Sequence, residues 1–410
     1  MPMDVPESAP SPRGRRRIAE MIVTPVACPD PPLLNHHGVH EATFLRAVVR
    51  LRTADGLEGL GEGPGGGLFV QQLRTAAKHV VGADPYQIER LRVLVGDNQP
   101  VFAAIESACL DLIGKVTGRP VYELLGGPVR RRVSFAAYLF YKEEGDDPWG
   151  PALTPEQLVR QAERFHELYG MTVFKLKGGV LDPWQECATM RLLRERFGPR
   201  AGLRIDPNAA WSVETALRVA ERLRDFDLEY LEDPTAGIEG MAQVARHTPI
   251  PLSTNMCVTA FDHVPAAFRA GAVQVVLGDH HGWGGLTAFR HLGAVCATLR
   301  WGLSQHSNSH LGISFAAMIH AAAAIPQLTY ASDTHYPWNP HDVVRETDRF
   351  RFHDGAIDVW DAPGLGVSID EDKLAAAAEA YERRGERLVR DDVGAMLDRD
   401  PDWLPLMPKW

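Results

Sequence analysis

A chain of 410 residues is long enough for two or three domains, although a single β/α barrel alone occupies about 250 residues. Its formal net charge of −10 at pH 7 disfavours general binding to nucleic acids or membrane surfaces, whereas a local cluster of positive groups can still bind a small anionic molecule. The five cysteines lie far apart without a C-x-x-C pair. That usage is typical of the reducing cytoplasm and argues against a disulfide framework or a zinc site.

Residues 1–17 are rich in proline, serine and arginine, and we expect them to form a disordered leader. Three consecutive arginines before an apolar run superficially resemble an export signal. Glu20 and Pro25 interrupt that run, which is also too short, so we expect the protein to stay in the cytoplasm. Nowhere does an apolar segment approach the length of a membrane span.

Residues 18–130 have the character of an α+β unit. Two strands are predicted within 18–52, on either side of a polar loop at 33–40. The glycine-rich stretch 59–67 that follows them is typical of a turn, and helical periodicity comes after it. Strands followed by helices indicate a two-layer α+β arrangement.

After residue 130 the pattern changes to short apolar strands that alternate with amphipathic helices. One helix starts after Thr154 and ends at Gly170, and another starts at Ser212, each with the expected capping residue. Strands in such alternation form a parallel sheet, and eight of them close a barrel. The predicted strands are 133–138, 173–176, 202–205, 229–231, 251–254, 273–277, 301–304 and 328–331.

A polar side chain follows almost every one of these strands. The seven are Lys177, Asp206, Glu232, Asn255, Asp279, His306 and His335. They recur at intervals of roughly 23 to 29 residues, the length of one βα unit. Because the carboxyl ends of barrel strands meet at one mouth, we expect a ring of functional side chains there.

Three of these residues offer only oxygen atoms to a ligand. Asp206, Glu232 and Asn255 together suit Mg²⁺, which prefers oxygen ligands and keeps positions for water and substrate. Asp206 and Asp233 each precede a proline and can instead be plain turn formers. We keep that interpretation for Asp233, but it does not account for Glu232, since glutamate has no turn preference.

Two kinds of proton-transfer group accompany the oxygen ligands. Asp279 and His306 follow neighbouring strands, and a hydrogen bond between them would raise the pKa of the imidazole and make it a general acid/base. Lys175 and Lys177 share one face of their strand; inside a barrel, burial and like charge would lower a lysine pKa towards the range of a general base. A solvated strand edge with two lysines is the plain alternative. The set suits abstraction of the α-proton of a carboxylate, with a metal-stabilised enediolate.

The motifs that carry this chemistry resemble, in order and spacing, those of the enolase superfamily, in its glucarate dehydratase branch. In the barrel they are Lys175-Leu-Lys177, Ile205-Asp-Pro-Asn208, Leu231-Glu-Asp-Pro234, Ser253-Thr-Asn255 and His306-Ser-Asn308. Residues 104–115, followed by Gly118-Arg-Pro120 and Leu124-Leu-Gly-Gly127, are similar to the capping-domain signature of the superfamily. An asparagine as the third metal ligand and the H-S-N context of the histidine point to this branch.

The resemblance implies an α/β fold of the TIM-like, modified (β/α)7β barrel type, at 131–361. It implies an α+β capping domain at 18–130, which the C-terminal segment at about 362–410 completes. Mg²⁺ is the implied cofactor, a small acid sugar is the implied partner, and the chain is expected to form a homo-oligomer.

The resemblance also implies residue roles. Lys177 would be one base and His306 with Asp279 the other acid/base, while Lys175 would be an electrostatic helper and Asn208 a further member of the catalytic set. The implied substrate contacts are Asn35, His40, Tyr141, Ser307, Asn308, His335 and Arg390.

The implied reaction is the Mg²⁺-dependent dehydration of an acid sugar, a hexarate such as D-glucarate, with loss of the β-hydroxyl as water. Departures from the family pattern at residues 97–102, at Ser309 and at Tyr336-Pro-Trp338 leave the far end of the substrate open. Alternatives are an acid-sugar epimerase or racemase, and a weakly active paralogue that binds acid sugars or a dehydratase partner. A Schiff-base aldolase fits less well, because it has no use for three oxygen ligands.

Overall fold

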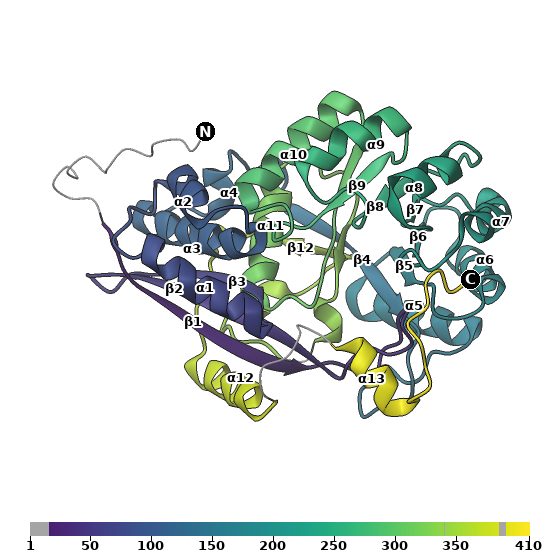
Figure 1. Ribbon diagram of the computed structural model, residues 1–410, viewed down its shortest axis with the longest axis horizontal. Helices are drawn as coiled ribbons and strands as arrows, with labels where there is room; N and C mark the ends of the chain where they lie inside the picture. The colour runs from purple at the N-terminus through teal and green to yellow at the C-terminus, as the bar shows by residue number, and fades with distance from the viewer. Residues whose placement is uncertain (1–15, 340, 385–390) are drawn as a thin grey trace.

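The computed structural model describes residues 16–339, 341–384 and 391–410 (Figure 1). The N-terminal part is an antiparallel sheet with the strand order β1-β2-β3. Its strands are β1 (Ile18–Pro29), β2 (Thr43–Thr53) and β3 (Glu58–Pro64). Of the leader expected at 1–17, the structure describes Arg16 and Arg17, and the other residues lie outside the described part of the chain.

Strand β3 occupies the glycine-rich segment where we expected a turn. Its glycines let the strand lie directly against helix α3 (Gln99–Thr117). A Cβ atom on Gly59 would sit 2.1 Å from the carbonyl oxygen of Ala108, and one on Gly61 would sit 2.0 Å from that of Ala104. The prediction of a turn was therefore wrong here, because these glycines serve the close approach of a strand to a helix.

Helices cover this N-terminal sheet (Figure 1). They are α1 (Gly67–Val80), α2 (Ile88–Val95) and α3. Val49 of β2, Leu73 of α1 and Ile105 of α3 belong to one hydrophobic cluster between the two layers. The predicted α+β arrangement is thus present, with one strand more than expected.

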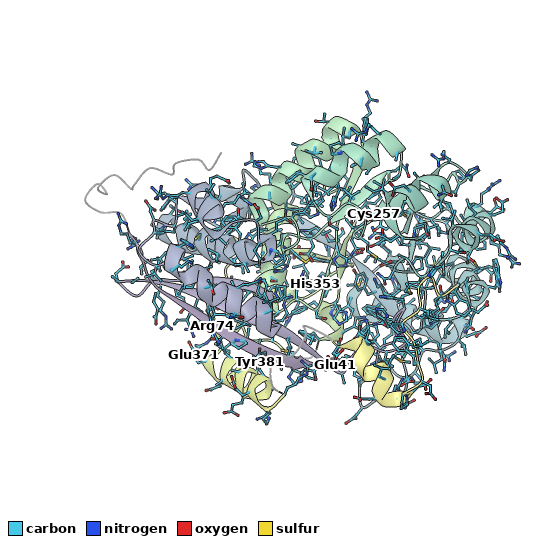
Figure 2. All side chains as sticks on the ribbon, viewed as in Figure 1. Glu41, Arg74, Cys257, His353, Glu371 and Tyr381 are labelled. Carbon is cyan, nitrogen blue, oxygen red and sulfur yellow. The ribbon has the colours of Figure 1, made fainter. Side chains whose placement is uncertain are left out.

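Helix α12 (Glu371–Arg384), from the far end of the chain, packs against β1. Tyr381 joins Ala27 in a small hydrophobic cluster, and Glu371 pairs with Arg50 at 2.6 Å. Figure 2 labels Tyr381 and Glu371 on this helix. The N-terminal sheet therefore holds helices from both ends of the sequence.

The second sheet contains eight parallel strands in the order β10-β9-β8-β7-β6-β5-β4-β11, with β12 added antiparallel on β4. The strands are β4 (Arg132–Phe140), β5 (Val173–Lys177), β6 (Gly202–Asp206), β7 (Tyr230–Glu232), β8 (Leu252–Thr254), β9 (Val275–Gly278), β10 (Gly302–Gln305), β11 (Ser332–Thr334) and β12 (Ala356–Asp358). The sheet curls as a barrel does (Figure 1). The predicted TIM-like barrel with an α+β cap is confirmed.

The eighth strand is displaced from its predicted place. The first seven predicted strands agree with the structure to within two residues at each end, but β11 starts after the predicted 328–331. Leu328 forms an isolated bridge to Leu303, and Ser332 Oγ donates to Gln305 Oε1 at 2.8 Å, which connects the two ends of the sheet. The strand itself contains Asp333, a buried charged residue. Because of this charge, a search for apolar runs does not detect the strand.

Helices alternate with the barrel strands, as predicted. They are α4 (Val121–Leu124), α5 (Pro155–Tyr169), α6 (Pro183–Phe197), α7 (Val213–Leu223), α8 (Gly237–Ala245), α9 (Val264–Ala270), α10 (Leu286–Leu299) and α11 (Gly312–Ala324). Short 3₁₀ turns are η1 (Arg224–Phe226), η2 (Phe261–His263), η3 (Tyr336–Trp338) and η4 (Thr347–Phe350). The predicted caps are confirmed: Thr154 forms a capping box at the start of α5, Gly170 ends it at φ 68°, and Ser212 caps α7.

The C-terminal segment divides between the two parts of the molecule. After α12 come helix α13 (Asp392–Arg399) and a tail that reaches barrel loops. The backbone N–H of Lys409 donates to the carbonyl of Ala210 at 2.8 Å, and that of Ser212 donates to Trp410 at 2.6 Å. Among the described residues, the helices are too short or too polar to cross a membrane.

Candidate active site

The predicted ring of polar side chains stands at the carboxyl edge of the parallel sheet. Each of its members is the last residue of a strand or follows one directly. A cavity of about 420 Å³ opens there, between this edge and the N-terminal loop at 35–41. From the ring it is lined by Lys177, Asn255, His306 and His335, and from the N-terminal loop by Asn35, His36 and His40. The site is therefore shared by the barrel and its cap.

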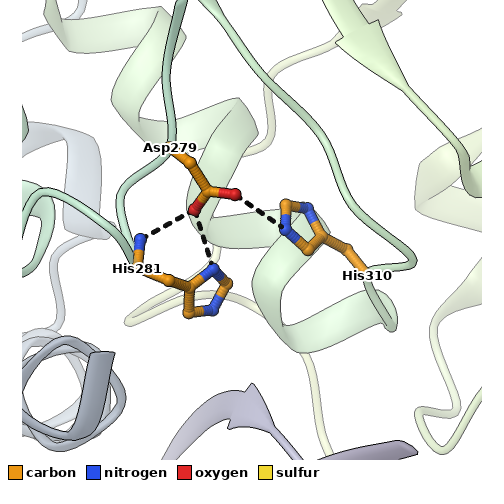
Figure 3. Close-up of side chains that lie close together, drawn as sticks. All are labelled: Asp279, His281 and His310. Carbon is orange, nitrogen blue, oxygen red and sulfur yellow. Dashed lines mark hydrogen bonds and ion pairs between the residues drawn. The ribbon is translucent and has the colours of Figure 1, made fainter. Parts of the chain in front are cut away.

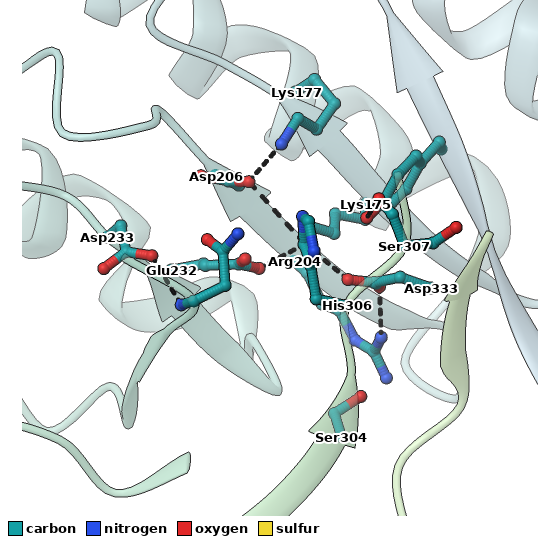
Figure 4. A network of polar contacts seen from close by, with 12 residues as sticks. Lys175, Lys177, Arg204, Asp206, Glu232, Asp233, Ser304, His306, Ser307 and Asp333 are labelled. Carbon is teal, nitrogen blue, oxygen red and sulfur yellow. Dashed lines mark hydrogen bonds and ion pairs between the residues drawn. The ribbon is translucent and has the colours of Figure 1, made fainter. Parts of the chain in front are cut away.

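A buried network of opposite charges lies under the cavity (Figure 4). Lys175 Nζ is 2.7 Å from Asp333 Oδ2, contacts Glu232, and lies 3.7 Å from Asp206. Burial alone would lower the pKa of Lys175, but Asp333 and Glu232 outweigh it and raise that pKa well above its ordinary value. The expectation of a lowered lysine pKa was wrong for Lys175, because surrounding carboxylates dominate over the neighbouring ammonium.

Lys177 is the more accessible of the two lysines. Its side chain is 12 % exposed, whereas that of Lys175 is fully buried. The Lys177 ammonium contacts Asp206 and lines the cavity. The Lys177 ammonium is therefore accessible from the cavity, whereas the Lys175 ammonium is enclosed by the carboxylates beneath it.

Sequence reasoning missed two members of this network. Asp333 accepts hydrogen bonds from Lys175 and, through Oδ1 at 3.2 Å, from Arg204. Arg204 also pairs with Glu229 at 2.6 Å and is fully buried. Arg204 is a charged residue between apolar neighbours on β6. Strand alternation predicts that such a residue points away from the apolar core, unless a buried partner is known. The signal that could have found Asp333 is the need of a buried Lys175 for an anion.

The proposed metal ligands come together from three adjacent strands. Asp206 and Glu232 are fully buried, and Asn255 follows β8 beside them. The Asn255 side-chain oxygen faces the carboxylates of Glu232 and Asp233. In the opposite orientation of the amide, its nitrogen would donate to these two carboxylates at 3.3 Å and 2.9 Å, and its oxygen would accept from His306 Nε2 at 3.0 Å. Two carboxylates and an amide oxygen are the ligand atoms that Mg²⁺ prefers, so the residues fit a divalent cation, whose place beside Glu232 and Asp206 is bordered by the ammonium groups of Lys175 and Lys177.

Asp233 is more than the plain turn former that we expected. Its backbone has a positive φ of 36°, as a turn requires, but its carboxylate also accepts hydrogen bonds from Thr254 Oγ1 at 2.5 Å and from the backbone N–H of Asn255 at 2.8 Å. Burial, with the nearby Asp206 charge, raises the pKa of Asp233 to about 7. Asp233 thus holds the segment that presents Asn255.

His306 and Asp279 lie close together, as predicted. His306 Nδ1 is 3.5 Å from Asp279 Oδ2. The same carboxylate accepts hydrogen bonds from the backbone N–H of His281 at 2.8 Å and from His281 Nδ1 at 3.0 Å, and His310 Nε2 is 3.8 Å away (Figure 3). Burial would raise the pKa of Asp279, but the charge and hydrogen bonds of His281 and the hydrogen bond of His306 lower it well below its ordinary value.

The predicted substrate contacts are placed unequally. Asn35, His40, Ser307, Asn308 and His335 line the cavity, and so does Asn208 of the predicted catalytic set. Asp30, which sequence reasoning missed, lies 3.7 Å from His40 Nδ1 and 3.0 Å from His335 Nε2 and so ties the two rings together. Arg390 lies outside the described residues.

Tyr141 is a predicted contact that the structure places away from the cavity. Tyr138 and Phe140 line the cavity from β4, and side chains alternate along a strand, so the side chain of Tyr141 points the other way. It is buried near Glu186, and burial together with that charge raises the pKa of Tyr141 well above its ordinary value. His36, which sequence reasoning did not single out, lines the cavity instead.

A curled parallel sheet with carboxylates, lysines and a His–Asp pair at its carboxyl edge, beneath an α+β cap, defines a capped β/α-barrel enzyme. The chain belongs to the enolase superfamily. Residues 157–373 match the Enolase C-terminal domain-like family, and residues 18–126 match the Mandelate racemase / muconate lactonizing enzyme, N-terminal domain family.

Individual relatives agree with this assignment. The chain is 46 % identical to a probable glucarate dehydratase of Streptomyces coelicolor, over 96 % of this chain and 99 % of that one. An enolase from Mycobacterium smegmatis complexed with tartrate is 50 % identical with a TM-score of 0.94, over 98 % and 100 % of the two chains. An enolase from Thermobispora bispora complexed with magnesium and formate is 48 % identical with a TM-score of 0.92, over 96 % and 100 %.

Proposed function

We propose that this protein is a Mg²⁺-dependent dehydratase of an acid sugar, a hexarate such as D-glucarate. The observation that carries the proposal is the position of two proton-transfer groups on either side of the oxygen ligands. Lys177 contacts Asp206 of β6, whereas His306 Nε2 faces Asn255 after β8 at 3.0 Å. A carboxylate bound between them would present its α-carbon to a base on each side.

The residues of the chain divide the work of the reaction. Mg²⁺ held by Asp206, Glu232 and Asn255 would supply positive charge beside the substrate carboxylate. Lys177 or His306 removes the α-proton, according to the configuration of that carbon. His306, with Asp279 behind it, then gives a proton to the departing β-hydroxyl. Lys175 keeps the carboxylates beneath the site compensated, since its own charge stays in place.

The relatives support an acidic substrate. One solved relative binds tartrate, a small dicarboxylate, and another binds magnesium with formate, while the S. coelicolor relative carries the description probable glucarate dehydratase. In this chain, Asn35, His40 and Ser307 line the cavity with hydrogen-bonding groups that suit hydroxyls and a second carboxylate.

A keto-acid screen tests the proposal. The protein is incubated with Mg²⁺ and each hexarate stereoisomer, beside the matching monoacids, and the keto-deoxy product is trapped with semicarbazide. We expect product from at least one diacid, and none from the same reaction with Lys177→Met/His306→Asn or with excess chelator. If every diacid and monoacid stays unchanged, the proposal is wrong.

Epimerisation at the α-carbon is the second candidate. The placement of a base on each side of the ligand set favours it, because removal from one side and return on the other inverts the carbon. Deuterium uptake from D₂O into recovered substrate, with inverted configuration and without keto-acid, would establish epimerisation in place of dehydration.

A further inference from the structure

His281 lies between the capping sheet and the His306–Asp279 pair. It is 5 % exposed and follows Asp279 by two residues, in the loop between β9 and α10. Its Nδ1 donates to Asp279 Oδ1 at 3.0 Å, and its Nε2 is 2.9 Å from the carbonyl oxygen of Glu62 on β3 and 3.0 Å from Ser314 Oγ. One imidazole ring therefore bridges the two parts of the molecule.

The partners of this ring define its hydrogen-bonding state. A carboxylate oxygen faces one ring nitrogen and a carbonyl oxygen faces the other, and neither oxygen can donate. Nδ1 therefore donates to Asp279, while Nε2 can donate to the Glu62 carbonyl or accept from the Ser314 hydroxyl. Arg46 Nη2 also lies 3.5 Å from His281 Nε2, while Arg46 Nε pairs with the carboxylate of Glu62 at 2.6 Å.

Glu62 is fixed to the barrel by its side chain as well as by its carbonyl. The carboxylate accepts hydrogen bonds from the backbone N–H groups of Leu311 at 3.0 Å and Ser314 at 2.8 Å. Both belong to the start of helix α11, which follows the segment that carries His306. A single residue of the cap thus holds the chain on both sides of the proton-transfer pair, once through α11 and once through His281.

We propose that His281 is a positioning residue through which the capping domain holds Asp279, and through Asp279 orients the ring of His306. The proposal rests on the proposed function, because the reaction gives that orientation its purpose. Asp279, His281 and His310 have polar atoms within 4.8 Å of one another, and hydrogen bonding accounts for the place of His281 in this group, since both of its ring nitrogens have partners.

Two substitutions separate the two contacts of the ring. The amide nitrogen of asparagine sits near the position of Nδ1, so His281→Asn keeps a donor to Asp279 and loses Glu62. The amide nitrogen of glutamine sits near the position of Nε2, so His281→Gln keeps a donor to Glu62 and loses Asp279. His247→Gln changes an exposed histidine beyond α8 and serves as the matched control.

The readout compares the two faces of the substrate. Lys177→Met and His306→Asn first identify which α-epimer of a diacid gives its proton to which base in D₂O. We expect His281→Gln to slow reaction of the His306-dependent epimer about 100-fold, since a misplacement of about 1 Å costs that much. His281→Asn should slow the same epimer about tenfold. The Lys177-dependent epimer should change less than about twofold in both, and His247→Gln should leave both epimers unchanged.

Equal loss for the two epimers would show that His281 merely supports the fold and would overturn the proposal, as would unchanged rates in both variants. A wild-type protein that neither exchanges nor dehydrates any acid sugar would refute the proposed function instead. In that case, nitrogen-15 NMR of the His306 ring tests the positioning role of His281 without an activity assay. The His306 Nδ1 resonance should move in His281→Gln and stay in His281→Asn, and a resonance that is unmoved in both excludes the positioning role.

Discussion

Lys177 ends β5 with its ammonium in the cavity and in contact with Asp206. Lys177→Met keeps most of the aliphatic stem and removes the base. We expect it to lower keto-acid formation about 10²- to 10⁴-fold, the usual contribution of a positioned general base, as measured by steady-state kinetics. Lys78→Met, on the exposed face of α1, should leave turnover unchanged. A Lys177→Met protein with full activity would contradict the assignment of this base.

Asp333 compensates two buried cations, Lys175 and Arg204. Asp333→Asn leaves both with less negative charge around them, and removal of one member of a buried ion network costs about 3–5 kcal/mol. We expect a loss of that size in the free energy of unfolding, measured by urea denaturation. Asp348→Asn, which breaks an exposed pair with Arg351, should cost less than about 1 kcal/mol. Similar losses in the two variants would contradict the network.

Residues at strand ends could be predicted because their positions repeat with the βα unit. The spacing indicated Lys177, Asp206 and Glu232, and the structure brings them together. Asp333 and Arg204 could not be found in this way. Each pairs with a charged residue on another strand, and the two partners become neighbours only when the sheet closes. Tyr141, which the resemblance implied as a substrate contact, lies on the other face of β4 from the cavity-lining Tyr138 and Phe140, a difference that a motif match does not resolve.

The contact between β3 and α3 depends on the absence of side chains from the strand. A methyl group on Gly61 would sit 2.0 Å from the carbonyl oxygen of Ala104, so the two elements would have to move apart. We expect Gly61→Ala to lower the free energy of unfolding by about 3 kcal/mol, the upper part of the usual range for overpacking. Gly56→Ala meets open space at a positive φ of 83° and should cost about 1 kcal/mol. Thermal denaturation of both variants measures the difference, and equal melting temperatures would refute it.

Helix α11 contains a histidine that its partners keep neutral. His320 Nδ1 accepts from the backbone N–H of Tyr122 at 3.3 Å, and Nε2 donates to the carbonyl of Leu365 at 3.1 Å. Burial lowers the pKa of His320 to about 4. Between pH 6.5 and 4, His320 is therefore protonated in the unfolded chain but not in the folded chain. The free energy of unfolding consequently falls as the pH falls.

The expected loss from His320 over that pH window is about 3 kcal/mol. Urea denaturation at a series of pH values measures it. His320→Gln should be less stable at pH 7 but should show a shallower decline towards pH 4, while the other buried histidines contribute equally to both proteins. Parallel pH profiles would show that His320 does not titrate in this way.

At the level of elements, apolar runs located most of the barrel, but they failed where a strand carries something else. Strand β11 is short and polar, and it lies inside because Asp333 serves Lys175. Strand β3 is rich in glycine because α3 lies against it. In both cases the residues of the strand are set by contacts with a segment distant in the sequence, and local propensity alone predicts a loop.

The N-terminal loop that carries Asn35 and the helix α13 meet beside the cavity. Asp392, at the start of α13, accepts from Asn35 Nδ2 at 2.6 Å and from the backbone N–H of Glu41 at 2.7 Å. We expect Asp392→Ala to raise KM about tenfold, since a charge-assisted hydrogen bond that orders the cavity wall contributes about 1.5 kcal/mol. The value of kcat should change little in steady-state assays with Mg²⁺. Asp398→Ala, on the exposed end of the same helix, is the control, and an unchanged KM for Asp392→Ala would contradict this role.

The double attachment of Glu62 limits how freely such enzymes can exchange parts. The cap supplies Asn35 and His40 to the cavity wall, and through Glu62 it also reaches the support of the His306–Asp279 pair. A chimera that combines this barrel with the cap of a relative would therefore alter substrate choice and turnover together. A chimera meant to change substrate selectivity alone would have to keep Arg46 and Glu62 of this chain together with its barrel.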